Sequence, residues 1–280
     1  MHYVWASSIS ILGLAVLVQG LGSGLLAVWL PFELSAAQAL QASLFAGGAT
    51  GLGALGVLVL RRASSSQGTF RFLALSAGAM FSAALLSLLV PAARMTATPA
   101  ALDVLLAGVA GYAAMSALDR LLPHIHAAPR ESGAWPAHSV RLMVVAIAAH
   151  NLPEGFAVGA GFGGGDALGW GTALSIGMQN IPEGLIVATA LWSIGISRAI
   201  AFVLAIGTGL LEPLGAALGL LAIAASPLVL PWALAVAAGA MMFVIFEDLI
   251  PESFKGASHF KATSYFAVGS LGMAAILTVF

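Results

Sequence analysis

The phrase HNLPEG at residues 150–155 returns as QNIPEG at residues 179–184, and both copies interrupt segments that are otherwise apolar. Each copy begins about ten residues into an apolar run of roughly 20 residues, the length of a helix that crosses a bilayer. A carboxylate at that depth is expensive to bury, so Glu154 and Glu183 are candidates for function. The repeated phrase therefore predicts a membrane fold and a polar site within it.

The composition supports a membrane protein and argues against several other classes. Of the 280 residues, 60% are hydrophobic and 8% are charged, and the mean hydropathy is +1.03. A net charge of −1 with scattered basic residues argues against a nucleic-acid partner. The chain has no cysteine, so any metal must be bound by histidine, carboxylate, amide or thioether groups.

Prolines, charges and polar loops divide the apolar runs into nine predicted spanning helices. The first has no basic segment before it and leads directly into further spans, so we expect it to be retained. Eight spans result if this first segment lies flat on the membrane. Most loops are too short for a soluble domain, so residues 1–280 are predicted to form one integral-membrane domain. The predicted spans lie near residues 8–30, 38–60, 70–92, 99–122, 140–161, 168–193, 199–224, 231–250 and 262–280.

The basic residues predict the orientation of these spans. With nine spans, one side of the membrane carries nine of the ten lysines and arginines, and the other side carries Arg94 alone. Because cytoplasmic loops carry the excess of basic residues, the N-terminus is predicted to be cytoplasmic and the C-terminus extracytoplasmic. We expect the location to be a cell membrane, in bacteria the inner one.

The two motif copies present their polar groups on one helix face each. His150 and Glu154 are four residues apart, as are Gln179 and Glu183, and residues at this spacing share a face. Because both copies lie near mid-membrane, the two faces can meet at one level. The same faces are bordered by the amides Asn151 and Asn180.

A third carboxylate, Glu212, lies close to the middle of the seventh predicted span. Divalent cations could hold three carboxylates ionised at this depth. Pro153 and Pro182 each free a carbonyl four residues earlier, a known way of building ion sites from helices. Imidazole together with carboxylate suits zinc, iron or manganese better than magnesium, and a thioether would favour softer ions such as cadmium.

Three further groups of residues have two open interpretations each. Met80, about ten residues into its span, is either a packing residue or a thioether ligand. The loop histidines His124 and His126 are either solvated or collect metal transiently. The acidic group at the cytoplasmic end of the eighth span is explained equally by interfacial solvation or by a metal exit route. It consists of Glu247, Asp248 and Glu252.

The paired motifs resemble those of the ZIP (Zrt/Irt-like) metal transporters, in particular the prokaryotic GufA-type branch. Supporting segments extend the resemblance over most of the chain: Gly78-Ala79-Met80, Ser87 to Pro91, Leu118 to His124, Glu212 to Gly215 and Asp248 to Ser253. The resemblance implies an all-α bundle of eight helices, here with one additional N-terminal helix. It also implies a homodimeric carrier in the lipid bilayer that moves divalent ions, chiefly Zn²⁺, into the cytoplasm, with no organic cofactor.

The resemblance also implies two neighbouring metal sites. One ion would be held by Met80, His150, Glu154, Gln179 and Glu183, and its neighbour by Asn151, Asn180, Glu183 and Glu212, with Glu154 shared. Some relatives have aspartate where this chain has Asn180, so we expect the second site to be weaker or optional. The resemblance further implies that one group of helices, here the second, fifth, sixth and seventh spans, moves against the others, and we expect their glycines to allow sliding contact.

Two rival functions remain at this point. An intramembrane zinc hydrolase needs three protein ligands, an open position for water and a base, yet the chain has no HExxH motif and His150 is its only histidine within a predicted span. A proton-coupled carrier of a small organic solute would use the same buried carboxylates without a metal. We expect a transporter rather than an enzyme, with no catalytic residues.

Overall fold

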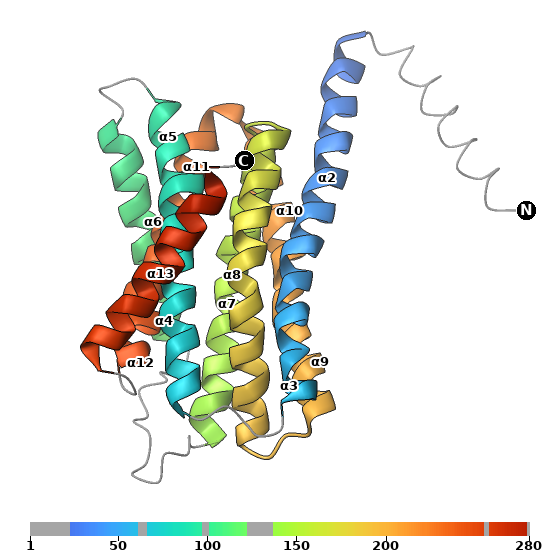
Figure 1. The fold of residues 1–280 in the computed structure, drawn as a ribbon. Coiled ribbons are helices and arrows are strands. Elements are labelled where there is room, and N and C mark those ends of the chain that lie inside the picture. Colours follow the sequence, from blue (N-terminus) through green and yellow to red (C-terminus); the bar gives the residue numbers. More distant parts are fainter. Residues whose placement is uncertain (1–22, 61–65, 97–100, 122–136, 255–257, 279–280) are drawn as a thin grey trace, which may run out of the picture.

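The computed structural model describes residues 23–60, 66–96, 101–121, 137–254 and 258–278, and every regular element in these ranges is a helix (Figure 1). This confirms the predicted all-α class. The elements are α2 (Ser23–Ala54), α3 (Gly56–Val59), α4 (Ser66–Ala83), η1 (Ala84–Leu89), α5 (Val90–Arg94), α6 (Ala101–Leu121), α7 (Ala137–Phe162), α8 (Asp166–Ser193), α9 (Arg198–Gly209), α10 (Leu211–Ala225), η3 (Pro227–Val229), α11 (Leu230–Phe243), η4 (Val244–Leu249), α12 (Ile250–Phe254) and α13 (His259–Leu277).

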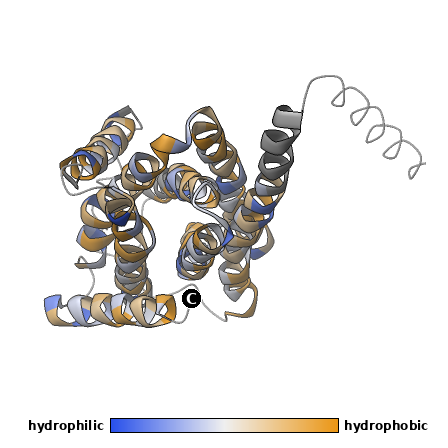
Figure 2. Cartoon of the chain, turned by 90° about the horizontal axis from the view of Figure 1, so that it is seen from above, coloured by the Kyte–Doolittle hydropathy of each residue, from blue (hydrophilic) through white to orange (hydrophobic). Residues whose placement is uncertain are grey.

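Within the described residues, six helical stretches are long and apolar enough to cross a membrane, and each coincides with a predicted span. The predicted spans at 140–161 and 168–193 correspond to α7 and α8, which carry the motifs. With 26 and 28 residues, these two helices are about 39 and 42 Å long, enough to cross the bilayer core. Large apolar side chains such as Leu105, Val203 and Leu271 are exposed, and hydrophobic residues colour many outward faces in Figure 2. Such a surface suits a lipid environment.

The N-terminal part differs from the prediction. A break was expected at Pro31 and Glu33, but α2 is one helix from Ser23 to Ala54. A proline removes one backbone hydrogen bond, and a long helix can continue past this loss. Most of the predicted first span, 8–30, lies outside the described residues.

Two wide helical turns precede prolines in corresponding places. The π-helix η1 comes directly before Val90-Pro91, and the π-helix η4 directly before Ile250-Pro251. Proline has no N–H and its ring collides with the carbonyl four residues earlier, so a wider turn accommodates it. As a result, α4, η1 and α5 form one spanning segment, and α11, η4 and α12 form another.

The helices pack as two groups. The motif group consists of α2, α7, α8, α9 and α10, in which α7 packs on α10 and α2 packs on α8 and α9. The support group consists of α4, η1, α5, α6, α11, η4, α12 and α13, in which α4 packs on α13 and α11 on α6. Figure 1 shows α2 and α9 on one side, α6 and α13 on the other, and α7 and α8 between them. The groups meet where α4 faces α8 and α11 faces α7.

Close helix contacts within each group depend on glycine. At twelve described glycines an added Cβ would come within 2.3 Å of a backbone oxygen on another helix, and in every case both helices belong to the same group. Gly155, for instance, would meet the Glu212 carbonyl at 2.0 Å. Without a side chain, glycine lets the backbones of neighbouring helices approach this closely. The twelve are Gly47, Gly53, Gly78, Gly111, Gly155, Gly159, Gly184, Gly209, Gly215, Gly219, Gly239 and Gly269.

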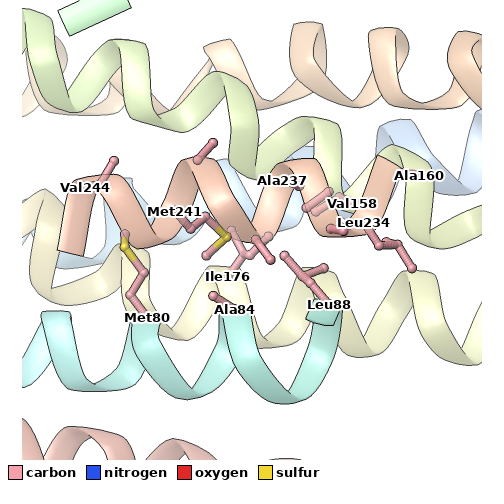
Figure 3. Packing of buried hydrophobic residues seen from close by; sticks show 14 of the residues in the cluster. Met80, Ala84, Leu88, Val158, Ala160, Ile176, Leu234, Ala237, Met241 and Val244 are labelled. Atoms are coloured by element: carbon pink, nitrogen blue, oxygen red, sulfur yellow. The ribbon is translucent and has the colours of Figure 1, made fainter. Parts of the chain in front are cut away.

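The boundary between the groups is built differently. Met80, Ala84 and Leu88 of the α4–η1 segment and Met241 of α11, all in the support group, share one hydrophobic cluster with Val158 of α7 and Ile176 of α8 from the motif group (Figure 3). We expected glycines to form the sliding surface, whereas the described close glycine contacts lock helices together inside each group. Side chains without hydrogen-bonding groups cover much of the boundary instead.

Candidate metal centre

The polar residues of both motif copies are buried in the middle of the motif group. Gly155 of α7 brings that helix against the backbone of Glu212, and Gly184 of α8 brings its helix against Thr50 of α2. The backbones can therefore approach closely enough for short polar side chains to meet. None of the predicted ligands in this group is more than 7% exposed: His150, Asn151, Glu154, Gln179, Asn180, Glu183 and Glu212.

The two motif copies are joined directly by their side chains. The Gln179 amide nitrogen donates to Glu154 Oε1 at 2.9 Å. This contact agrees with the expectation that the polar faces of the two helices meet at one level. The second carboxylate oxygen of Glu154, Oε2, and the amide oxygen of Gln179, Oε1, are buried without a hydrogen-bond partner among the described residues.

The second motif copy also reaches the third carboxylate. Asn180 Nδ2 donates to Glu212 Oε1 at 2.5 Å and to the Ala46 carbonyl at 3.0 Å. A carbonyl oxygen can only accept, so the amide nitrogen rather than the amide oxygen has to face Ala46. Glu212 lies at the start of α10, just after the helix breaks at Leu210 and directly before Pro213. The structure thus links α2, α8 and α10 through one amide.

The carboxylate of Glu183 has a partner that the sequence analysis missed. Ser76 Oγ of α4 donates to Glu183 Oε1 at 3.1 Å, and Ser76 is fully buried. Ser76 lies one helical turn before Met80, so the two share a face of α4. That spacing was the available signal, but a single serine in an apolar helix usually bonds to its own backbone and carries little information.

One residue of the predicted exit route lies beside the predicted site. His150 Nε2 is 3.3 Å from Asp248 Oδ2 of η4. Glu247 is exposed and accepts a hydrogen bond from the Tyr112 hydroxyl at 2.7 Å, whereas Glu252 is half-buried. His124 and His126 lie outside the described residues.

Met80 lies in the hydrophobic cluster between the two groups and is 1% exposed. Figure 3 shows its side chain directed towards α11, near Val244 and Met241. This position fits the packing interpretation. The thioether interpretation stays a prediction, because Met80 is also one turn from Ser76, which contacts Glu183.

The arrangement is suited to a cation. Glu154 Oε2, Glu212 Oε2 and Asn180 Oδ1 are buried without a hydrogen-bond partner among the described residues. Unpaired oxygen atoms in a buried site carry an energetic cost that a cation can remove. Within the described part of the chain, no three His, Cys, Asp or Glu side chains converge closely enough to hold a metal ion. A bound ion would therefore need the amide oxygens as well, or a small rearrangement.

Comparisons with known proteins point to one family. The family model described as "ZIP Zinc transporter" matches residues 138–277, which include both motif copies and Glu212. The zinc transporter GufA of Myxococcus xanthus is 42% identical over 237 residues, which cover 80% of this chain and 92% of that protein. The zinc transporter ZIPB of Bordetella bronchiseptica is 38% identical over 224 residues, covering 77% and 72% of the two chains. Zinc transporter ZupT of Salmonella arizonae is 34% identical over 229 residues, covering 75% and 84%.

Proposed function

Because the chain belongs to the ZIP family of zinc transporters, we propose that it imports divalent transition-metal ions into the cytoplasm. Zinc is the principal cargo, and cadmium, iron and manganese are further candidates. One observation carries the proposal: three carboxylates from α7, α8 and α10 are buried in a membrane protein, and two of them, Glu154 and Glu212, keep an oxygen atom without a hydrogen-bond partner among the described residues. Carboxylates of this kind mark ion pathways.

The cargo ion would exchange water for protein ligands at the centre of the motif group. His150, Glu154, Gln179 and Glu183 supply nitrogen and oxygen ligands, a set that suits zinc. Asn151, Asn180 and Glu212 line the adjoining second position, and Met80 would add a thioether from the support group. The amides now bound to Glu154 and Glu212 are neutral donors, which a divalent ion can replace at a carboxylate.

Release would proceed towards the cytoplasmic side past Asp248. This carboxylate lies 3.3 Å from His150, so an ion leaving His150 meets another negative group at once. The distribution of basic residues supports a cytoplasmic position for this end of η4, with the N-terminus inside, the C-terminus outside, and a bacterial inner membrane as the expected location. His124, His126, Glu247 and Glu252 are further candidates along this route.

We further propose that the motif group moves as a unit against the support group, exposing the site to each side of the membrane in turn. The proposal is supported by the glycine contacts, which hold helices together within each group. It is also supported by the boundary, where side chains such as Met80, Leu88 and Ile176 make non-directional contacts. Such contacts can be exchanged during a small displacement without breaking a backbone hydrogen bond. A homodimer, as the sequence resemblance implies, would anchor the support group.

Zinc uptake into proteoliposomes tests this function. Glu183→Gln keeps the side-chain size but removes the charge, and uptake should fall at least roughly tenfold, the cost of losing even a supporting partner of a metal ligand. Asp103→Asn is the matched control, because Asp103 is an exposed carboxylate in the first turn of α6. It should retain most of the uptake. Full zinc uptake by Glu183→Gln would overturn the site assignment, and absence of uptake by the unaltered protein would overturn the function.

A further inference from the structure

Two of the polar side-chain contacts among the described residues cross the boundary between the groups. Ser76 Oγ of α4 donates to Glu183 of α8 at 3.1 Å. His150 of α7 lies 3.3 Å from Asp248 of η4. In both contacts a residue of the support group engages a predicted metal ligand of the motif group.

Four other side-chain contacts in the described part of the chain each join residues of the same group. Gln179 and Glu154 are both in the motif group, as are Asn180 and Glu212. In the support group, Ser82 bonds to Ser270 and Tyr112 bonds to Glu247. Contacts of this kind are kept when the groups move relative to each other. The Ser76 to Glu183 and His150 to Asp248 contacts are not kept, because their partners lie on opposite sides of the boundary.

We propose that Ser76 is a further positioning residue of the transport site, which holds Glu183 in the alignment seen here until a divalent metal ion takes Glu183 as its ligand. The inference rests on the proposed function. Metal binding would draw Glu183 and His150 onto the ion and so loosen both contacts across the boundary. Loading the site would thereby release the motif group for movement.

A simpler role for Ser76 makes the opposite prediction. If its hydroxyl only oriented Glu183 for the metal, removing it would weaken metal binding by roughly 10- to 100-fold. If it competes with the metal, binding has to break a hydrogen bond to a charged group, which is worth roughly tenfold or more. Its removal would then tighten metal binding by about tenfold. The direction of the change separates the two roles.

Three variants make the comparison. Ser76→Ala removes the hydroxyl, and Ser76→Thr keeps a hydroxyl at the same position. Ser82→Ala is the matched control, because Ser82 is also buried on α4, at 4% exposure, and its hydroxyl bonds to Ser270 within the support group. Any general effect of removing a buried hydroxyl from α4 would appear in both alanine variants.

The first measurement is zinc affinity of the full chain in detergent, by competition with a zinc indicator. Ser76→Ala should bind zinc about tenfold more tightly, whereas Ser76→Thr and Ser82→Ala should match the unaltered protein. Weaker or unchanged binding by Ser76→Ala would overturn the proposal. So would a Ser76→Thr variant that behaves like Ser76→Ala. Zinc uptake by the unaltered protein, measured separately, shows whether the proposed function stands when the inference fails.

The second measurement follows the alignment of the groups directly. The chain has no cysteine, so Leu44→Cys on α2 and Val268→Cys on α13 provide the only sites for two spin labels. Both side chains are exposed, at 48% and 60%. Zinc should shift the distance distribution of the labelled parent. The Ser76→Ala version should show part of that shift before zinc is added, and the Ser82→Ala version should not. Identical zinc-free distributions for the parent and Ser76→Ala would refute the inference.

Discussion

The neighbouring glycines of α2 provide a test of how helix packing positions the third carboxylate. A Cβ on Gly47 would lie 2.2 Å from the Gly209 carbonyl oxygen and 3.4 Å from Glu212 Oε1, whereas a Cβ on Gly48 meets nothing within 4 Å. A real Cβ essentially never comes closer than 3.0 Å to another atom. Lengthening the distance between the Gly47 Cβ and the Gly209 oxygen from 2.2 Å to 3.0 Å needs a displacement of about 0.8 Å between α2 and α9. The two nearest atoms, the Gly209 carbonyl oxygen at 2.2 Å and carbon at 3.0 Å, belong to the backbone, so no side-chain rotation can relieve the clash.

We therefore expect Gly47→Ala to destabilise the protein by roughly 1–3 kcal/mol, as overpacking does, and Gly48→Ala to change stability by less than about 0.5 kcal/mol. Gly47→Ala should also reduce zinc uptake, because the displacement at Gly209 is passed along the chain to Glu212, three residues later. Thermal unfolding in detergent measures the first effect, and proteoliposome uptake at matched protein levels measures the second. Equal behaviour of the two variants would refute the packing argument.

Two further predictions concern the ligands themselves. Met80→Leu conserves volume and should cost less than about 1.5 kcal/mol of stability; if the thioether binds metal, cadmium uptake should fall more than zinc uptake, and an equal fall would favour the packing role. Asn180→Asp replaces an amide that donates to Glu212 with a second carboxylate, so it should raise the zinc content per chain from near one towards two, measured by elemental analysis of the purified protein. An unchanged zinc content would contradict the expectation that Asn180 weakens the second site.

Helix periodicity predicted many of the buried polar residues of α7 and α8, because the spacing of residues along one helix determines which of them share a face. The four-residue spacing of Gln179 and Glu183 determines which face of α8 is polar, whichever helices surround it. The depth of each motif copy then determined which side chains could meet across helices, and the bond between Gln179 and Glu154 lies at that level. Their role as metal ligands stays a prediction. The confirmed ZIP resemblance depended on the same short phrases.

Contacts that depend on the packing of distant helices could not be predicted in this way. Nothing near Ser76 in the sequence indicates that α4 faces α8, 107 residues further along the chain, where Glu183 lies. The proximity of His150 and Asp248 depends likewise on α11 packing against α7 and on the wide turn of η4 before Pro251. The continuous α2 was missed because a proline near a charge is a frequent helix end, although it does not force one.

If the proposed metal site is correct, the partners of the three carboxylates would allow one site both to bind and to release a divalent ion. Glu154, Glu183 and Glu212 each accept a hydrogen bond from a neutral side chain, respectively from Gln179, Ser76 and Asn180. A neutral donor reduces the cost of burying a carboxylate but cannot balance its charge, so a divalent ion can displace it. A lysine or arginine in the same place would compete far more strongly and would keep the ion out. In the proposed transport cycle, neutral partners would therefore leave the affinity for metal high enough for loading, and they would bind the carboxylates again as the ion departs.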